Sequence, residues 1–162
     1  CPTVREDVAF GPRNLSLAAD IVNARVAEAM AETGVSDLAD RAPHNLSGGE
    51  KRMCSIAAVL ALQPRLMIYD EPSASLDIRS RRRLIEFLLA SPATSLIASH
   101  DLELVLEICP RTIVIDDGRI VADGPSPEIM DDAELMERHG LERPHSLGPH
   151  AVPHHHPPPH TD

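Results

Sequence analysis

A run of apolar side chains at residues 66–69 ends directly in two carboxylates, Asp70 and Glu71. Such a run is typical of a strand buried in a parallel sheet, and these sheets place their ligand sites at the carboxyl ends of the strands. An aspartate there can hold Mg²⁺ through water, and the adjacent glutamate can orient or deprotonate an attacking water. A strand that simply stops at a solvated Asp-Glu pair explains the same residues equally well, so this motif alone leaves both interpretations open.

Residues 94–99, with Leu96, Ile97 and Ala98 at their centre, predict another buried strand, followed by His100 and Asp101. A lone histidine at a strand end is more often structural than catalytic. His100, however, lies one predicted strand away from Asp70 and Glu71, where an imidazole could donate a hydrogen bond to a phosphate oxygen. Asp101 is expected to cap the helix that follows.

Residues 47–50 read Ser-Gly-Gly-Glu and open another predicted helix. Ser47 and Glu50 have the spacing of a capping box. Two consecutive glycines weaken a first turn by roughly 1 kcal/mol each relative to alanine, so the cap does not explain Gly48 and Gly49. Glycines suit a helix start that a ligand must approach closely, and the exposed N–H groups there favour a phosphate.

Before residue 47 the chain is expected to be helical. Thr3 is predicted to cap a short helix that Gly11 and Pro12 stop, and a longer amphipathic helix should then run to Gly34. The expected buried face of that longer helix consists of Leu17, Ile21, Ala24, Ala27 and Met30.

After residue 64 the pattern becomes α/β. A helix over residues 79–90 should bury one apolar face, made of Leu84, Ile85, Leu88 and Leu89. Asp117-Gly118 between two β-rich runs predicts a hairpin, and one or two short helices are expected between residues 125 and 140.

Composition narrows the function classes. The formal net charge of −10 argues against nucleic acid as a partner, because an acidic chain does not attract phosphate backbones. The three cysteines are too sparse for a disulfide framework. No apolar run approaches the roughly 20 residues that a membrane-spanning helix needs.

Together these motifs resemble the ATP-binding cassette (ABC) family in order and spacing over roughly residues 3–143. Residues 46–50 match the signature motif, residues 66–71 the Walker B strand, residues 73–77 the D-loop, and His100 the switch histidine. The resemblance implies an α/β fold, namely a partial P-loop NTPase with a helical signature subdomain and a mostly parallel sheet. Residues 1–46 would be part of the helical subdomain, residues 47–143 the signature helix with the rest of the RecA-like core, and residues 144–162 a disordered tail.

A narrower resemblance is to energy-coupling-factor ATPases, which drive uptake of cobalt, nickel and vitamins. It rests on residues 3–15 and 131–141. The chain departs from the general family pattern at Ser75, where glycine is usual, and at Ile78, where proline is common. Neither change removes a group that the chemistry needs.

The resemblance also implies the ligands, ATP and Mg²⁺. Two such ATPases pair head to tail, and contacts to the ATP held by the partner are implied for Ser47, Gly48, Gly49 and Glu50. Asp77 would couple the two sites.

The implied chemical roles fall on the two strand ends. Asp70 would hold Mg²⁺ through water, Glu71 would polarise the attacking water, and His100 would steady the γ-phosphate. The function would be ATP hydrolysis coupled to cobalt or nickel uptake by an importer. The partners would be a second ABC ATPase, identical or different, a transmembrane coupling subunit and a substrate-binding membrane subunit, at the cytoplasmic face of the membrane.

The sequence contains no Gly-x-x-x-x-Gly-Lys-Ser/Thr, the loop that cradles phosphates with backbone N–H groups and a lysine. We therefore expect a truncated sequence that binds ATP poorly in its own site and is inactive alone. Two alternatives remain: a half-site or interaction module that only presents its signature motif, and an ABC ATPase that serves no transporter.

Six of the nine histidines lie in residues 145–160, where prolines separate them. Neutral imidazoles suit Ni²⁺, Co²⁺, Zn²⁺ and Cu²⁺, so His154, His155 and His156 are candidate metal ligands. A low-complexity tail without a role explains the composition equally well.

Overall fold

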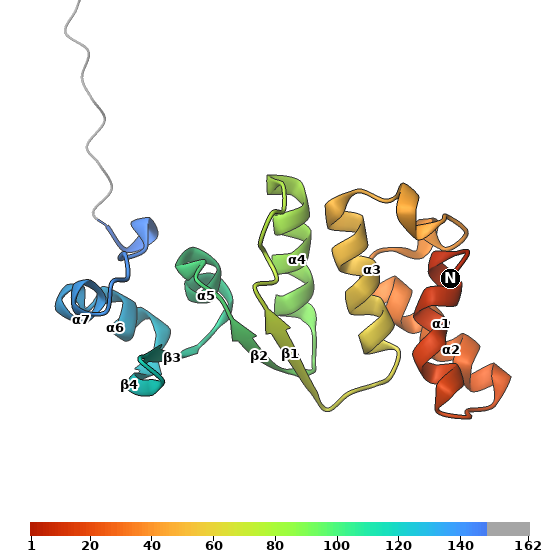
Figure 1. Ribbon diagram of the computed structural model, residues 1–162, viewed down its shortest axis with the longest axis horizontal. Coiled ribbons are helices and arrows are strands. Elements are labelled where there is room, and N and C mark those ends of the chain that lie inside the picture. Colours follow the sequence, from red (N-terminus) through yellow and green to blue (C-terminus); the bar gives the residue numbers. More distant parts are fainter. Residues whose placement is uncertain (149–162) are drawn as a thin grey trace, which may run out of the picture. The chain divides into compact units, whose positions relative to one another are not determined.

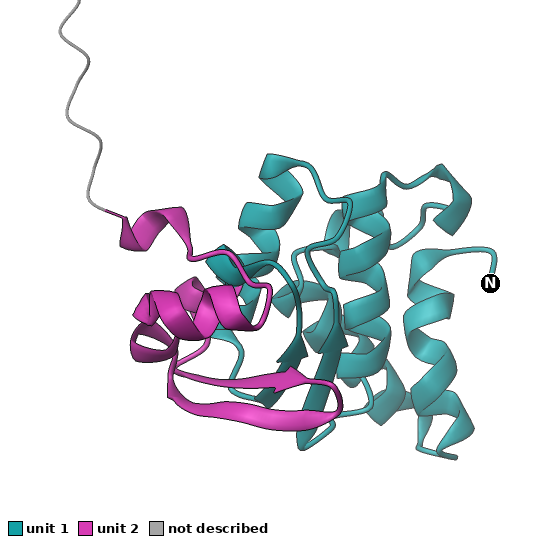
Figure 2. Cartoon of the chain, turned by 60° about the vertical axis from the view of Figure 1, so that its left-hand side comes forward, with its two compact units in different colours: residues 1–104 teal, residues 105–162 magenta. Residues whose placement is uncertain are grey.

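The computed structural model describes residues 1–148 and divides the chain into two compact units, Cys1–Leu104 and Val105–Asp162 (Figure 2). The boundary lies within one helix, α5 (Leu102–Ile108). Compactness is a different criterion from the sequence pattern, so the division at residues 46 and 143 stays a prediction. No helix within residues 1–148 has both the length and the apolarity to span a membrane.

Three helices form the first part of unit 1 and pack on one another: α1 (Val4–Asn14), α2 (Ala19–Glu32) and α3 (Gly48–Leu60) (Figure 1). Two short 3-10 turns, η1 (Ser36–Leu38) and η2 (Pro43–Asn45), join α2 to α3. The buried side chains between these helices are almost all aliphatic, among them Val8, Val26, Met30 and Ala57.

Thr3 caps α1 as predicted, because its Oγ1 accepts a hydrogen bond from the Glu6 N–H at 3.3 Å. The predicted stop at Gly11 and Pro12 is wrong, since α1 continues to Asn14. Pro12 is buried, and this burial offsets the hydrogen bond that a proline cannot donate. Gly11 remains in the helix because it packs against Leu62, whose Cδ2 would lie 2.8 Å from an added Cβ.

The predicted buried face of α2 is mostly wrong. Ile21 is 43% exposed, whereas the residues that are buried are Val22, Val26, Ala29 and Met30. Both sets follow a helical spacing, and a helix this rich in alanine does not distinguish them by hydrophobicity. Its predicted end is confirmed: Gly34 has a φ of +68°, and the Val35 N–H donates to the Met30 carbonyl at 2.9 Å.

The second part of unit 1 is a parallel strand pair, β1 (Leu66–Asp70) and β2 (Thr94–Ala98), connected through α4 (Ile78–Ala90). Parallel pairing is confirmed, with Asp70 opposite Ala98. The prediction that both strands are buried is wrong in part. Met67 and Tyr69 are buried, but Ile68 is 69% exposed, and β2 is exposed over most of its length. Within unit 1, Met67 and Tyr69 pack with residues of α3 and α4 in the core, whereas Leu66, Ile68 and Leu96 stay exposed.

Helix α4 buries Leu84 and Ile85 as predicted, and also Phe87. Leu88 is half-buried, but Leu89 is 60% exposed, so this part of the predicted face is wrong. Phe87 takes its place in the contact with the core because a helix presents positions three residues apart, such as 84 and 87, on one side.

Unit 2 consists of the hairpin β3 (Arg111–Asp116) and β4 (Arg119–Pro125), with α6 (Ser126–Asp131), α7 (Ala133–Arg138) and the 3-10 turn η3 (His145–Leu147). The predicted Asp-Gly turn is confirmed, since Asp117 and Gly118 both have positive φ, as a type I′ turn requires.

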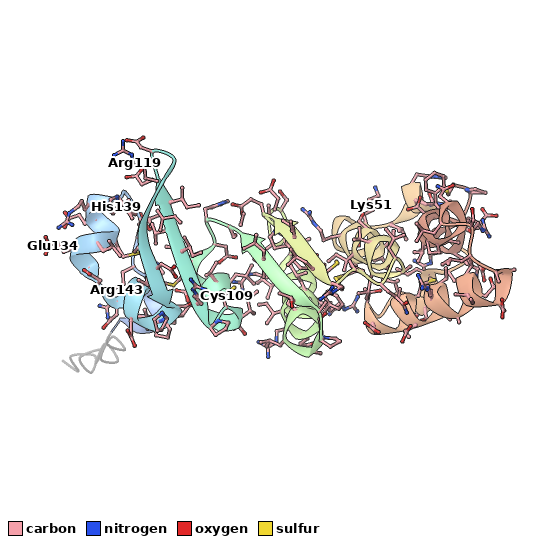
Figure 3. All side chains as sticks on the ribbon, turned by 90° about the horizontal axis from the view of Figure 1, so that it is seen from below. Lys51, Cys109, Arg119, Glu134, His139 and Arg143 are labelled. Carbon is pink, nitrogen blue, oxygen red and sulfur yellow. The ribbon has the colours of Figure 1, made fainter. Side chains whose placement is uncertain are left out.

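One side-chain pair ties the end of α7 to the hairpin. His139 follows α7, and its Nδ1 lies 2.7 Å from Asp116 Oδ2 at the end of β3. Figure 3 labels His139 together with Arg119, the first residue of β4. The turn η3 lies at the start of residues 144–162, and the disorder of that tail stays a prediction. His154, His155 and His156 lie outside the described residues.

Candidate active site

The carboxyl end of β1 positions Asp70 and Glu71. The Glu71 N–H donates to the Ala98 carbonyl at 2.9 Å, which extends the hydrogen bonding of the strand pair by one residue. Glu71 has a φ of +43°, a left-handed conformation that costs a non-glycine residue roughly 1–3 kcal/mol. Such strain is frequent at functional sites, and here it turns the Glu71 side chain toward the end of β2.

The Glu71 carboxylate accepts three hydrogen bonds from the residues that follow β2. Its Oε1 accepts from the His100 backbone N–H at 2.9 Å and lies 2.7 Å from His100 Nδ1, while Oε2 accepts from Ser99 Oγ at 3.0 Å. An ionised carboxylate has about four acceptor positions. Among the described residues nothing occupies the fourth position, on Oε2, so it is available for a water molecule.

The contact between Glu71 and His100 shifts the pKa of both groups. The hydrogen bond from the His100 side chain, helped by Ser99, holds the pKa of Glu71 below its usual range against a smaller effect of burial. The hydrogen bond to Glu71 raises the pKa of His100 in return. Glu71 is thus ionised at neutral pH. It is a weak base, so it is better suited to orienting a water molecule than to deprotonating it.

Asp101 follows His100 directly, and hydrogen bonds from two other segments hold its side chain. Its carboxylate accepts hydrogen bonds from Ser73 Oγ at 3.0 Å and from Arg81 through both Nε and Nη2 at 3.2 Å. It also caps α5, as predicted, by accepting from the Leu104 N–H at 3.0 Å. Burial alone would raise the pKa of Asp101, but these hydrogen bonds outweigh it and hold that pKa below its usual range.

Sequence reasoning missed Ser73, Arg81 and Ser99 as parts of this site. A serine directly before the histidine and a basic helix after the D-loop were visible, but neither pattern says which side chain reaches which acceptor. Their partners are 20 to 28 residues away in the chain, so the contacts come from the fold and not from local spacing.

The helix start at residues 47–50 forms the predicted capping box. The Ser47 N–H donates to Glu50 Oε2 at 2.7 Å, and the Glu50 N–H donates to Ser47 Oγ at 3.2 Å. The hydrogen bond from the Ser47 backbone lowers the pKa of Glu50. Because Glu50 is engaged in the cap and lies 3.8 Å from Arg41, its evident role in this chain is to hold the turn.

The two glycines differ. A Cβ on Gly48 would meet nothing within 4 Å, so Gly48 leaves open the kind of space that a phosphate needs. A Cβ on Gly49 would instead lie 2.5 Å from the Cβ of Ser80 in α4, and closer still to its Oγ. Close helix packing therefore explains Gly49 within the chain itself, which the sequence could not indicate.

Asp77 caps α4 at the end of the D-loop segment. Its Oδ1 accepts from the Ser80 N–H at 2.9 Å and its Oδ2 from Ser80 Oγ at 2.8 Å, and these hydrogen bonds lower the pKa of Asp77. Ser75 has a φ of +61°, which is the conformational reason that glycine would suit this position.

The sequence of the chain is similar to known ATP-binding proteins of ABC transporters. Residues 2–74 match the family model described as ABC transporter. A Synechocystis sp. protein provisionally described as an ABC transporter ATP-binding protein is 56% identical over 145 residues, covering 90% of this chain and 51% of that protein. The energy-coupling factor transporter ATP-binding protein EcfA of Methanothermobacter thermautotrophicus is 45% identical, covering 88% and 47%. The nickel import ATP-binding protein NikO of Rhodobacter capsulatus is 40% identical, covering 85% and 57%.

Among solved structures, CbiO1 from Clostridium perfringens, described as part of the ABC transporter complex CbiONQ, is 33% identical with a TM-score of 0.75. The match covers 84% of this chain and 56% of CbiO1. The chain matches part of an ABC transporter ATPase domain. It spans about half the length of the curated relatives that it matches.

In this ABC ATPase segment, the predicted site residues form two groups. Glu71 and His100 are in direct contact, with Asp70 beside Glu71. The signature residues and Asp77 form the other group, joined through the contact of Gly49 with Ser80. Within residues 1–148, no hydrogen bond or ion pair joins the signature residues to Glu71 or His100.

The group at the strand ends suits a magnesium ion. Asp70 is exposed at the strand end, and among the described residues no hydrogen bond or ion pair holds its carboxylate, so it fits a Mg²⁺ contacted through water. No cluster of three or more metal-ligating side chains occurs in the part of the chain that the structure describes. The donor set in residues 1–148 thus suits one carboxylate contributed to a shared Mg²⁺ and not a protein-enclosed metal.

Proposed function

We propose that the complete protein containing this segment is the ATP-hydrolysing subunit of an ABC importer of the energy-coupling-factor type. The observation that carries the proposal is the Glu71 carboxylate, which Ser99 and His100 hold by three hydrogen bonds while one acceptor position stays available. Orienting a water molecule for attack on a phosphoryl group needs an ionised, immobile acceptor of this kind.

The roles of the chain's residues follow from this geometry. Glu71 orients the attacking water through Oε2. In its protonated form, which the raised pKa favours, His100 donates from Nδ1 to Glu71 and from Nε2 to the γ-phosphate. Asp70 holds Mg²⁺ through water, and the metal neutralises charge on the phosphates.

The signature residues serve the ATP bound to a second ATPase subunit. The first turn of α3 is open at Gly48 and offers backbone N–H groups to a phosphate, with the hydroxyl of Ser47 beside them. Their separation from Glu71 and His100 supports two subunits paired head to tail, in which each nucleotide is contacted by both. Asp77 couples the two sites from the start of α4.

The transported substrate we propose is nickel or cobalt. The support is the description of NikO as a nickel import protein and the resemblance at residues 3–15 and 131–141. The partners are a second ABC ATPase, a transmembrane coupling subunit and a substrate-binding membrane subunit, with the ATPase at the cytoplasmic face of the membrane. The first helix, α1, exposes Phe10 and is the proposed contact with the coupling subunit.

The test is the variant Glu71→Gln in the complete protein. It keeps the size of the side chain but removes the charge, so ATP hydrolysis should fall by about a hundredfold or more while ATP binding persists. Glu137→Gln, on the exposed side of α7, is the matched control and should hydrolyse ATP like the wild type. Retained turnover in Glu71→Gln would refute the assignment.

A further inference from the structure

The signature helix and the D-loop segment meet at one side chain, Ser80. On one side of it lies Gly49 of α3, whose missing Cβ leaves the space that Ser80 fills. On the other side lies Asp77, which accepts hydrogen bonds from both the N–H and the hydroxyl of Ser80. Ser80 is therefore enclosed between a residue of the signature motif and the cap of α4.

This contact lies at the edge of a cavity. The cavity has a volume of about 400 Å³ and is lined by residues of both helices, among them Gly49, Met53, Ser80 and Phe87. Fewer side chains resist a displacement of a helix next to a cavity than in a fully packed region. At Gly49 and Ser80, by contrast, the two helices touch with no space to approach further.

We propose that Ser80 is a positioning residue that makes the signature turn and Asp77 move together. The proposal rests on the proposed ATPase function, because the signature turn and Asp77 face bound nucleotide only in a pair of such ATPases. A displacement of the first turn of α3 toward α4, when the partner's ATP docks on Gly48, pushes the Ser80 side chain and with it the Asp77 carboxylate. Ser80 thus couples ATP binding at one site to the position of Asp77, which faces the other site.

The test is a double-mutant cycle in the complete protein. Gly49→Ala places a methyl group against Ser80 and should lower kcat by about tenfold or more, since a displacement of 1 Å has effects of this size. Ser80→Gly removes the opposing side chain, so the double variant Gly49→Ala/Ser80→Gly should recover kcat to within about threefold of Ser80→Gly alone.

Ser80→Ala is the matched control in the same background. It keeps the Cβ that lies 2.5 Å from the added methyl, so it should not rescue Gly49→Ala. Alone, it removes the hydroxyl bond to Asp77 and should lower kcat several-fold at an unchanged KM for ATP, which a contact that only stabilises the fold would not do. Failure of Ser80→Gly to rescue, or equal rescue by Ser80→Ala, would overturn the proposal.

Thermal unfolding separates this proposal from the proposed function. If Gly49→Ala unfolds, the double variant must recover the melting temperature, and failure to do so overturns the steric contact. If the wild type hydrolyses no ATP, the proposed function fails, whereas the rescue of stability still reports on Ser80. If the wild type is active but kcat shows no rescue, the function stands and the role of Ser80 does not.

Discussion

Ser99 Oγ donates a hydrogen bond of 3.0 Å to Glu71 Oε2 and accepts one of 3.1 Å from the Asp101 N–H. A single hydroxyl thus joins the end of β1 to the helix that follows β2. Because Oε2 is also the oxygen with an acceptor position available, Ser99 fixes the direction in which that position points.

Replacing Ser99 tests this relationship. Ser99→Ala removes a hydrogen bond to a charged group, which is worth about 1.5–3 kcal/mol, and should lower kcat for ATP hydrolysis by about tenfold. The KM for ATP should change little, because Ser99 contacts the carboxylate and not the nucleotide. Steady-state kinetics of the complete protein provide both constants.

Two further variants control this experiment. Ser99→Thr retains the hydroxyl and should stay close to the wild type. Ser55→Ala removes an exposed hydroxyl on α3 whose one hydrogen bond within residues 1–148 goes to the Lys51 carbonyl, and it should leave kcat unchanged. If Ser99→Ala and Ser55→Ala behave alike, Ser99 has no part in orienting Glu71.

Arg81 and Arg82 are neighbours in α4 with different environments, and they should differ in their contribution to stability. Arg81 makes two hydrogen bonds of 3.2 Å to the half-buried Asp101, whereas Arg82 pairs with Glu86 on an exposed helix face. Arg81→Ala leaves a partly buried carboxylate without its cation and should lower the free energy of unfolding by about 1–3 kcal/mol. Arg82→Ala should cost less than about 0.5 kcal/mol. Urea unfolding measures both, and equal values would contradict this ranking.

The pair of Glu71 and His100 gives stability a defined pH dependence. The pKa of His100 is raised from 6.5, so its contribution is complete below pH 6.5 and is lost as the pH rises through the higher folded-state value. The pKa of Glu71 is lowered from 4.5, so its contribution is complete above pH 4.5 and is lost as the pH falls through the lower folded-state value. The pair should therefore stabilise the protein most between pH 4.5 and 6.5.

A comparison of variants checks this window. His100→Ala should lose most stability relative to the wild type between these two pH values, and the loss should shrink on either side. The same substitution in a Glu71→Gln background should show no such maximum. A difference that does not vary with pH would mean that the two side chains do not form this pair in solution.

How far the sequence predicted the molecule depends on the range of the interactions. Local patterns predicted the caps at Thr3, Ser47 and Asp101 and the turn at Gly118, because each is decided within a few residues. The choice between two apolar stripes on α2 was not local, since the neighbouring helices decide which one is buried.

The candidate site follows the same rule. The strand ends and the identities of Glu71 and His100 were visible as motifs, and the structure brings these two into contact. The support from Ser73 and Arg81 was not visible, because it depends on how α4 crosses the strand pair. The burial of β1 and β2 was overestimated, because an apolar run does not reveal whether a given chain supplies the covering layer on both faces.

Ser75 provides the last prediction, in which a substitution should strengthen the fold. Its φ of +61° is left-handed, a conformation in which a Cβ is strained and glycine is not. Ser75→Gly should therefore raise the free energy of unfolding by up to about 1 kcal/mol, after the greater freedom of glycine in the unfolded chain is deducted. Ser55→Gly, in the middle of α3, makes the same chemical change in a right-handed helix and should lower it by about 0.5–1 kcal/mol. Urea unfolding of both variants decides the matter: effects of opposite sign are expected, and a destabilised Ser75→Gly would show that the D-loop backbone does not hold this conformation in solution.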